Sequence, residues 1–430
     1  MASSLFWKGI SYAYGATALS VTFAIALVGE LSFEYEQRKR RRPFAWLFSS
    51  TLCSTLGRST TLVALDLPGY GGSDSLDYCG ANDVLNAISE AIVALKDKHL
   101  PPSEQEGGKR ANACLLAMTG EEWCIAYRLA AEAPALFDRV VILNSTFPPH
   151  ARAMTGKYLE QAKQPWTMWK QRPWQLSLLR QARSVASPVT SQLLKSNYIF
   201  IFNLPSSIVA LISGKLVAWL VGECHQIAYR SKGPLPASLA ADATASSNGP
   251  SPAECTNGAY SASVASRATR SGDWMQKILY YRQGLATRPW ENKSVHLPSL
   301  STPTRSSGVE SNDDSTALLS SSHPQYRLSS QLRVPMTVVY GLKDIALDPR
   351  ICLDGIGGFI ASDVRERSNI IRLPKCGHWA MLEQDGRSVI DAVLWWCHLE
   401  GTQEGNGGKS ELEARLSQWT QAGVTQIEWC

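Results

Sequence analysis

The ten cysteines of this 430-residue chain lack any CxxC pair and any spacing typical of metal ligands. A disulfide framework or a structural zinc site needs such pairing, so the pattern favours reduced thiols in a protein that faces the cytosol. The chain also lacks a glycine-rich phosphate loop and a dinucleotide-binding fingerprint. These absences predict a protein without a metal ion or another cofactor.

The chain also has only a small excess of positive over negative charge. The chain has 42 basic and 37 acidic residues, a net charge of +5. The run RKRRR at 38–42 carries five positive charges, so the rest of the chain is neutral overall. The excess of positive charge therefore comes from one short segment, and the sequence predicts no nucleic-acid partner.

An apolar stretch near the start, GISYAYGATALSVTFAIALVGELSF at 9–33, has Glu30 as its only charge. It is about as long as a membrane span. The basic run follows it, and basic flanks prefer the cytosolic side. The sequence therefore predicts a single-pass membrane anchor, an N-terminal transmembrane helix, with the body of the protein facing the cytosol. A buried N-terminal helix is the alternative.

A second apolar run, at 198–222, is interrupted by Asn203, Pro205 and Lys215. Proline breaks the helix geometry at the residue before it. A membrane crossing here would also place the two halves of the chain on opposite sides of the membrane. We therefore expect a pair of cap helices, which could rest on the membrane surface.

From residue 60 the sequence alternates between short apolar runs and segments with helical apolar spacing. Parallel strands that are buried on both faces need continuous apolar runs, and helices between them cover the sheet. The alternation predicts a doubly wound parallel sheet. The expected strands are 60–67, 111–118, 139–144, 334–341 and 369–374, and the expected helices are 82–96, with Asn82 as a possible cap, 125–137 and 387–400.

A helical insertion is expected to split this sheet. Residues 150–230 have helical apolar spacing, and their tryptophans Trp166, Trp169 and Trp174 are expected to pack the cap or to line an apolar pocket. Two stretches rich in small and polar residues predict disordered inserts. The expected division is an anchor at 9–33, a first core part at 60–148, a cap at 149–330 with inserts at about 231–272 and 298–329, a second core part at 331–400 and a C-terminal tail at 401–430.

Four segments in this arrangement resemble the α/β-hydrolase fold family, most closely its epoxide-hydrolase-like branch. They are DLPGYGGSD at 66–74, CIAYRLAAEAPALFDRVVILN at 124–144, VVYGLKDIAL at 338–347 and LPKCGHWAMLEQ at 373–384. Each motif alone is weak, but together they occur in the family's order around a helical insertion. The resemblance covers roughly residues 60–400. It implies an α/β-hydrolase-like, mostly parallel sheet flanked by helices, with an inserted helical cap.

The resemblance places Asp344 at the family's acid and His378 in its GHW motif. In such a site a carboxylate orients an imidazole, which acts as a base on a water or a nucleophile. Asp344 follows one expected strand, and His378 lies on the turn after the next, behind Gly377. Because open α/β sheets bind ligands at the carboxyl ends of their strands, we expect the two side chains to meet there. A turn aspartate and a surface-loop histidine are the alternatives.

The nucleophile position departs from the family pattern. That pattern, small-x-nucleophile-x-small on a sharp strand-to-helix turn, aligns with GEEWC at 120–124 and places Glu122 at the nucleophile. A glutamate carboxylate could open an epoxide through an ester. Counting back from the expected helix without a gap places Gly120, and not Glu122, at the nucleophile position. The Glu122 alignment would also turn the apolar face of the helix away from the sheet. Glu122, Glu121 and the absence of a nucleophile all stay open.

A second feature of the family is missing. No HG-x-P-like turn, which supplies backbone N–H donors for a developing negative charge, occurs before residue 60. Either the segment 43–57 supplies part of the early sheet, or the chain is an incomplete version of its family. Tyr198, Tyr280 and Tyr281 are candidates, by position only, for the acid groups that the resemblance implies for the cap.

Three functions are compatible with these observations. The first is a membrane-anchored, epoxide-hydrolase-like enzyme that hydrolyses a lipophilic small molecule through a carboxylate or water nucleophile, with His378 and Asp344 as a pair. The second is a catalytically degenerate hydrolase fold that binds a lipophilic ligand or a protein partner. A third is a membrane scaffold whose inserts dock partners. The sequence predicts no particular oligomeric state.

Overall fold

The computed structural model of the chain describes residue 63 and residues 65–99, 114–117, 122–212, 261–268, 274–291, 331–400 and 407–430. The predicted membrane anchor at 9–33 and the segment 43–57 lie outside these residues. Among the helices of the described part, none has the length and apolar character needed to cross a membrane.

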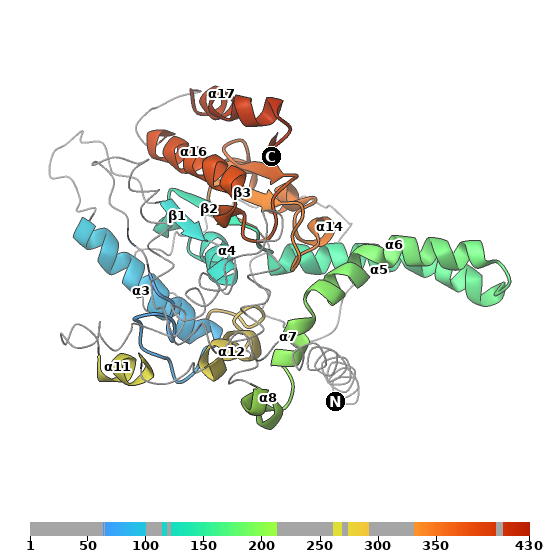
Figure 1. Cartoon of the computed structure of the whole chain (residues 1–430), viewed down its shortest axis with the longest axis horizontal. Helices are drawn as coiled ribbons and strands as arrows, with labels where there is room; N and C mark the ends of the chain where they lie inside the picture. The colour runs from blue at the N-terminus through green and yellow to red at the C-terminus, as the bar shows by residue number, and fades with distance from the viewer. Residues whose placement is uncertain are drawn as a thin grey trace, which may run out of the picture.

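A five-stranded sheet forms the centre of the molecule, with its strands in the order β1-β2-β3-β4-β5 (Figure 1). The first four strands are parallel, and β5 runs antiparallel to β4. Their bounds are Cys114–Ala117 for β1, Arg139–Leu143 for β2, Met336–Gly341 for β3, Asn369–Leu373 for β4 and Gln426–Trp429 for β5. The register aligns Gly341 with Leu373, so the carboxyl ends of β3 and β4 lie side by side. The predicted mostly parallel sheet is confirmed.

Helices accompany the sheet and also form a long insertion within it. Outside the insertion they are α3 (Ala81–His99), α4 (Glu122–Glu132), α14 (Pro349–Cys352), α15 (Ser362–Arg365), α16 (Gln384–Glu400) and α17 (Gly407–Gln421), with short 3-10 helices at Pro134–Leu136, Ile356–Phe359 and Ala380–Leu382. Between β2 and β3 the insertion contains α5 (Pro148–Gln171), α6 (Leu176–Lys195), α7 (Asn197–Phe202), α8 (Ser206–Ile212), α11 (Ala262–Ala268) and α12 (Trp274–Arg282). The described part of the 198–222 run is thus a helix pair divided at Pro205, as expected.

Two hydrophobic cores lie on the two faces of the sheet, because successive side chains of a strand point to opposite faces. On one face, Ile142 and Val338 belong to a cluster that includes residues of α3 and α4. On the other face, the neighbouring strand residues Val141 and Val339 pack with α16 and α17. The fully buried strands β2 and β3 therefore have helices on both sides, which is why their sequences are continuous apolar runs.

The expected strand at 60–67 is not formed in the residues that are described there, and this expectation is wrong for them. Val63 and Leu65 are exposed and take part in no strand. A strand needs a neighbour for its backbone N–H and C=O groups, and β1 is the last strand on its side of the described sheet. The following DLPGYGGSD segment forms the expected loop, in which the Asp66 carboxylate accepts a hydrogen bond from Gly72 N at 2.8 Å.

The start of α3 also differs from the expectation. The helix begins at Ala81, so Asn82 lies inside its first turn and is not the cap. The side chain has another partner: Asn82 Oδ1 accepts a hydrogen bond from Glu291 N at 2.8 Å. Asn82 therefore ties α3 to the segment that follows α12.

Two elements of regular structure, α11 and β5, are not predicted by the sequence, although a solvated helix is expected at 409–419. Helix α11 lies inside the expected insert 231–272, and Ser261 Oγ before it donates to Asp74 Oδ1 at 2.7 Å. Strand β5 lies inside the expected tail 401–430 and extends the sheet. The helix before it, α17, buries Leu412 and Leu416 completely, so it is a packed helix with one solvated face. The tail is therefore part of the core.

Candidate active site

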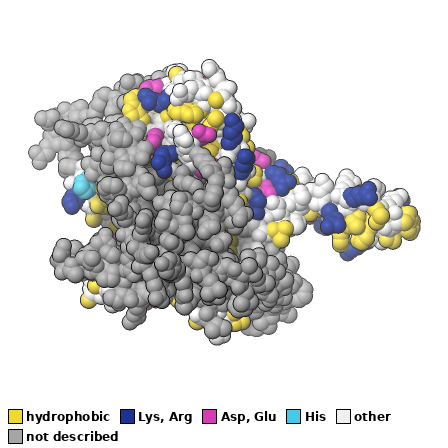
Figure 2. All heavy atoms as spheres, in the orientation of Figure 1, with side chains coloured by type: hydrophobic (Ala, Val, Ile, Leu, Met, Phe, Trp, Pro, Cys, Tyr) yellow, Lys and Arg dark blue, Asp and Glu magenta, His cyan; other side chains and the backbone are white. Residues whose placement is uncertain are grey.

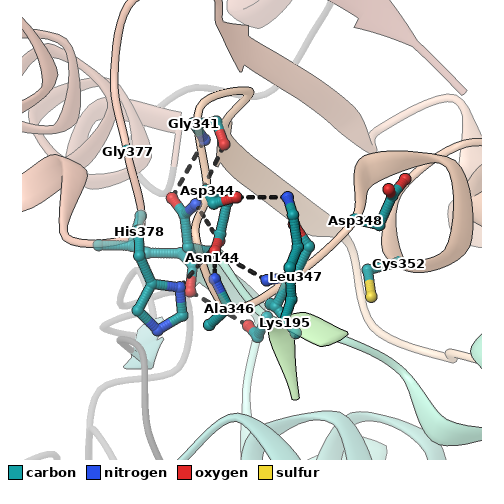
Figure 3. A network of polar contacts seen from close by, with 12 residues as sticks. Asn144, Lys195, Gly341, Asp344, Ala346, Leu347, Asp348, Cys352, Gly377 and His378 are labelled. Atoms are coloured by element: carbon teal, nitrogen blue, oxygen red, sulfur yellow. Dashed lines mark hydrogen bonds and ion pairs between the residues drawn. The ribbon is translucent and has the colours of Figure 1, made fainter. Parts of the chain in front are cut away.

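The carboxylate of Asp344 is buried in the loop after β3 and is held from several sides (Figure 3). Oδ1 accepts hydrogen bonds from the backbone N–H groups of Ala346 at 2.7 Å and Leu347 at 2.9 Å. Oδ2 accepts from Asn144 Nδ2 at 2.8 Å and lies 2.8 Å from His378 Nδ1. Each oxygen thus has two partners, which satisfies a buried group that would otherwise be costly to desolvate. The carboxylate is fixed in one orientation.

Asn144 joins the end of β2 to the end of β3. It directly follows β2 with a positive φ of 39°, a backbone conformation that asparagine tolerates better than most residues. Its amide nitrogen donates to Asp344, and its amide oxygen accepts from Gly341 N at 3.1 Å. Asn144 is a site residue that the sequence analysis did not single out. Its only signal is a polar residue at the end of an apolar strand.

The imidazole of His378 faces Asp344 from the loop after β4 (Figure 3). Its side chain is 13% exposed, and its ring makes an edge contact with the Trp379 ring. An ionised carboxylate can only accept, so Nδ1 carries the proton and the neutral ring has its free electron pair on Nε2. No described residue forms a hydrogen bond with Nε2. The two residues that the sequence places at the carboxyl edge of the sheet therefore meet in the structure.

A close backbone approach makes this contact possible. Lys343 N donates to Cys376 O at 2.9 Å, which joins the loop after β3 to the loop after β4. A Cβ atom on Gly341 would lie 2.3 Å from Gly377 O and 2.7 Å from Cys376 O, so only glycine fits at this position. On the other side, Gly377 N donates to the buried carboxylate of Glu383 at 2.6 Å.

Helix α6 of the insertion holds the Asp344 loop from outside the sheet. Lys195 Nζ donates to the carbonyl oxygens of Asp344 at 2.5 Å and of Leu347 at 2.9 Å. Gln192 Nε2 donates to Ala346 O at 3.2 Å, and Gln192 Oε1 accepts from Asp348 N at 2.6 Å. The insertion is thus in direct contact with the backbone that carries the acid.

An ion pair stabilises the far end of the same loop. Asp348 caps α14 by accepting from Arg350 N, and both of its oxygens also accept from the Arg350 guanidinium, at 2.9 and 2.7 Å. Burial by itself would raise the pKa of Asp348, but Arg350 and a hydrogen bond from Ser191 together outweigh it and lower the pKa of Asp348 below its ordinary value. The loop is therefore fixed at one end by the hydrogen bonds of the Asp344 carboxylate and at the other end by the ion pair of Asp348 with Arg350.

The predicted nucleophile position is only partly described. Strand β1 ends at Ala117 and helix α4 begins at Glu122, which gives the expected order of strand, turn and helix. Glu121 and the side chain of Glu122 lie outside the described residues. All side chains from 124 to 131 are buried, so α4 is enclosed on every side. The direction of a single apolar face therefore does not decide between the two alignments, and the role of Glu122 stays a prediction.

The three cap tyrosines do not form one group. Tyr280 donates its hydroxyl to Pro68 O at 2.7 Å, beside the Tyr70 ring. Tyr198 and Tyr281 instead form an aromatic cluster with Phe202, with 6.0 Å between the two tyrosine ring centroids. Of the three tyrosines, only Tyr198 and Tyr281 are in the aromatic cluster that includes Phe202 of α7. Among the described residues, no three His, Cys, Asp or Glu side chains are arranged to hold a metal ion.

Comparison with known proteins finds similar solved structures. No protein-family model matches the chain, and no curated protein matches it. An epoxide hydrolase mutant from Bacillus megaterium in complex with its product, a naphthyloxy-propane diol, is 13% identical with a TM-score of 0.46, over 82% of this chain and 89% of that chain. An epoxide hydrolase from Bacillus megaterium in complex with an inhibitor is 12% identical with a TM-score of 0.41, over the same shares.

A third similar structure comes from metagenomes of hot environments. It is described as a novel epoxide hydrolase of the α/β-hydrolase superfamily and is 18% identical with a TM-score of 0.39, over 79% of this chain and 80% of that chain. The structural neighbours of this chain are thus epoxide hydrolases of the α/β-hydrolase superfamily, at low sequence identity.

Proposed function

We propose that this protein is an epoxide-hydrolase-like enzyme of the α/β-hydrolase fold that hydrolyses a lipophilic small molecule. His378 is the base, and Asp344 is the carboxylate that orients it. The observation that carries this proposal is the 2.8 Å contact between Asp344 Oδ2 and His378 Nδ1, made at the carboxyl ends of β3 and β4. Ligands of open α/β sheets bind at this edge. The apolar run at 9–33 and the basic run after it support a membrane anchor as part of the proposal.

The chemistry of the pair follows from its protonation. With the proton on Nδ1, His378 Nε2 can accept a proton from a water molecule while that water attacks the substrate. The imidazolium that forms is next to the fixed Asp344 carboxylate, which stabilises its charge. Asp344 needs no reorientation during the step, because its other three hydrogen bonds already hold it.

Two versions of the reaction differ in the attacking group. In the first, the water attacks a carbon of the epoxide directly and the ring C–O bond breaks. In the second, the carboxylate of Glu122 attacks first and forms an ester, which the activated water then hydrolyses. In both versions the water loses a proton to His378 and the epoxide oxygen gains one. In the second version the first diol takes one oxygen atom from the protein.

One observation favours a different function, a degenerate hydrolase fold that only binds a lipophilic ligand. A nucleophile of this fold lies on a sharp and strained turn, and helix α4 already begins at Glu122. A helical backbone at this residue is unlike such a turn. In this case the Asp344 and His378 pair would serve to join the loops after β3 and β4.

The test is turnover by the full-length chain on a panel of apolar epoxides, together with an ester and a halide. The variant is His378→Gln, and the matched control is His99→Gln, a substitution of the exposed histidine at the end of α3. We expect diol from the wild type and the control, and a loss of about 100-fold or more in the His378 variant. If the folded wild type turns over none of the panel, the enzyme proposal fails and ligand binding becomes the better account.

A single turnover in water labelled with heavy oxygen separates the two versions of the reaction. If Glu122 attacks, the first diol contains unlabelled oxygen from the protein, and the His378→Gln variant accumulates an adduct that intact-mass measurement detects. If water attacks directly, every diol molecule contains label and no adduct forms. The Glu122→Gln variant then keeps its activity, whereas it is inactive under the first outcome.

A further inference from the structure

The hairpin of α5 and α6 extends away from the rest of the molecule, and its end has an unusual surface (Figure 1). Trp174, in the turn between the two helices, is 75% exposed, and Trp166 on α5 is 42% exposed. The expectation that the tryptophans pack the cap or line a pocket is therefore wrong for Trp166 and Trp174, whereas Trp169 is half-buried. Met168 and Leu176 are also exposed, and we call the end of the hairpin that carries these four apolar side chains the hairpin tip.

Packing between the two helices does not need these side chains. The seam of the hairpin is formed by small and cyclic residues that are buried, among them Ala162 and Pro165 of α5 and Ala182 of α6. The large apolar side chains of the tip point out from this seam. Exposed tryptophan is uncommon on a soluble surface unless it meets a partner.

The charge of the same region has one sign. Between residues 161 and 222 the sequence contains no Asp or Glu. Five exposed basic side chains lie along the outer part of the hairpin, Lys163, Lys170, Arg172, Arg180 and Arg183, and of these Lys163 forms an ion pair with Glu160 at 3.3 Å. In Figure 2 the projecting end shows hydrophobic and basic side chains next to one another.

The turn is also held in shape. Trp169 Nε1 donates to Pro173 O at 3.2 Å, and the Trp166 and Trp169 rings contact each other with centroids 5.1 Å apart. The Lys170 ammonium lies over the Trp166 ring at 5.8 Å. The tip thus presents its aromatic and basic groups together on a pre-formed surface, so that little order has to be gained on binding.

We propose that the hairpin tip binds the surface of a lipid bilayer that contains anionic headgroups. Tryptophan is favoured at membrane interfaces, because its ring is apolar and its N–H is polar. Leucine and methionine side chains next to it can enter the boundary between headgroups and acyl chains, and the basic side chains meet the anionic headgroups. This site is distant from the Asp344 and His378 pair and does not depend on the proposed function.

Charge decides between a bilayer and a second copy of this chain. Two hairpin tips would bring their basic side chains together, and like charges at close range oppose association. An anionic bilayer instead complements all five basic residues at once.

The test is hydrogen exchange of residues 166–180 in the full-length chain bound to phosphatidylcholine vesicles, with and without phosphatidylserine. The basic run at 38–42 also attracts phosphatidylserine, so the protection is assigned to the tip by variants of the tip that keep this run. We expect slower exchange at 166–180 only with phosphatidylserine. The double variant Lys170→Gln and Arg172→Gln should lose this protection, with about fivefold weaker binding of the tip for each charge removed.

A matched control comes from the same helix. Arg152 and Lys157 are exposed basic residues near the start of α5, and Arg152 is roughly 27 Å from Lys170 along the helix axis. The double variant Arg152→Gln and Lys157→Gln should keep the protection. Trp174→Ser should lose it even though every charge is retained.

Three results would overturn the proposal. The first is equal exchange at 166–180 in the two vesicle types. The second is protection that appears without vesicles as the protein concentration rises, which would identify a second copy of the chain as the partner. The third is equal loss of protection in the tip variant and in the Arg152 and Lys157 control.

Discussion

Gly341 is the residue on which the geometry of the candidate site depends most directly. It ends β3, and the backbone oxygens of Cys376 and Gly377 occupy the space in which a Cβ atom would lie. These atoms belong to the loop that carries His378. A side chain at this position must therefore push that loop away from Asp344.

We predict that Gly341→Ala destabilises the fold by about 1–3 kcal/mol and reduces turnover by more than the loss of folded protein explains. Gly358→Ala is the control, because no heavy atom lies within 4 Å of a Cβ atom there. Denaturant unfolding and kcat/KM of both variants check this. Equal behaviour of the two variants would show that the loop after β4 can shift without harm to the site.

His150 is a second buried residue with a measurable role, although it lies outside the candidate site. Its Nε2 donates to Asp354 O at 3.0 Å, and its Nδ1 has no hydrogen-bond partner among the described residues. Burial lowers the pKa of His150 below its ordinary value of 6.5. Protonation would place a charge and an unpaired N–H in an apolar contact with the Phe359 ring.

We predict that this histidine makes the fold less stable in acid. Its pKa is lower in the folded chain, so below about pH 6.5 the unfolded chain binds the proton first. The free energy of unfolding should fall from that pH downward, by at most about 1.4 kcal/mol per pH unit, until the folded-state pKa is reached. His150→Gln should flatten this slope, whereas His99→Gln, at an exposed position, should leave it unchanged. Urea unfolding over a pH series measures the slopes, and equal slopes in all three proteins would refute the role of His150.

Residues of the site divide into those that a motif reveals and those that only packing reveals. Asp344 and His378 could be predicted because each follows a recognisable strand at a fixed offset. Asn144, Gln192 and Lys195 could not be predicted, because their partners lie about 150 to 200 residues away in the sequence. Their contacts depend on strand register and on how α6 packs, which no local pattern encodes.

At the scale of elements, β5 closes one edge of the sheet. It pairs antiparallel with β4, and Arg372 on β4 forms ion pairs with Glu428 at 3.0 Å and with Asp354 at 2.9 Å. Trp429 Nε1 donates to Glu413 Oε1 on α17 at 2.8 Å, which ties the strand to its covering helix. Without β5, the backbone groups of β4 would form an open edge.

We predict that a chain ending at Thr425 is less stable by about 2–4 kcal/mol, because it loses the ladder to β4 and the half-buried Ile427 and Trp429. Gln426→Ala, which changes an exposed side chain of the same strand, should alter the stability by less than about 0.5 kcal/mol. Thermal and denaturant unfolding compare the three chains. A truncated chain as stable as the wild type would mean that β5 adds nothing to the sheet.

The expected strands at 111–118, 139–144, 334–341 and 369–374 are formed as β1, β2, β3 and β4. Strands β2 and β3 are largely apolar runs because helices cover them on both sides. The run at 60–67 has the same composition but no strand in its described residues, since a run does not reveal whether a partner is present. Strand β5 has only four residues, too few for its alternating pattern to stand out.

At the scale of the whole molecule, an insertion separates β2 from β3, and the site bridges this separation. Asn144 comes from before the insertion, Lys195 from within it, and Asp344 and His378 from after it. The candidate site therefore forms only when all three parts are folded together. The positions of β1 to β4 along the chain were predictable from sequence, whereas the contact of α6 with the Asp344 loop was not, because it follows from the path of the insertion.

A double-mutant cycle on kcat/KM, with Asp344→Asn, His378→Gln and the double variant, tests the central claim most directly. If the two residues act as one unit, the double variant is no slower than His378→Gln alone, because the carboxylate acts only through the imidazole. If the two losses multiply, or if neither variant changes turnover while the fold is intact, the pair is not the catalytic unit of this protein.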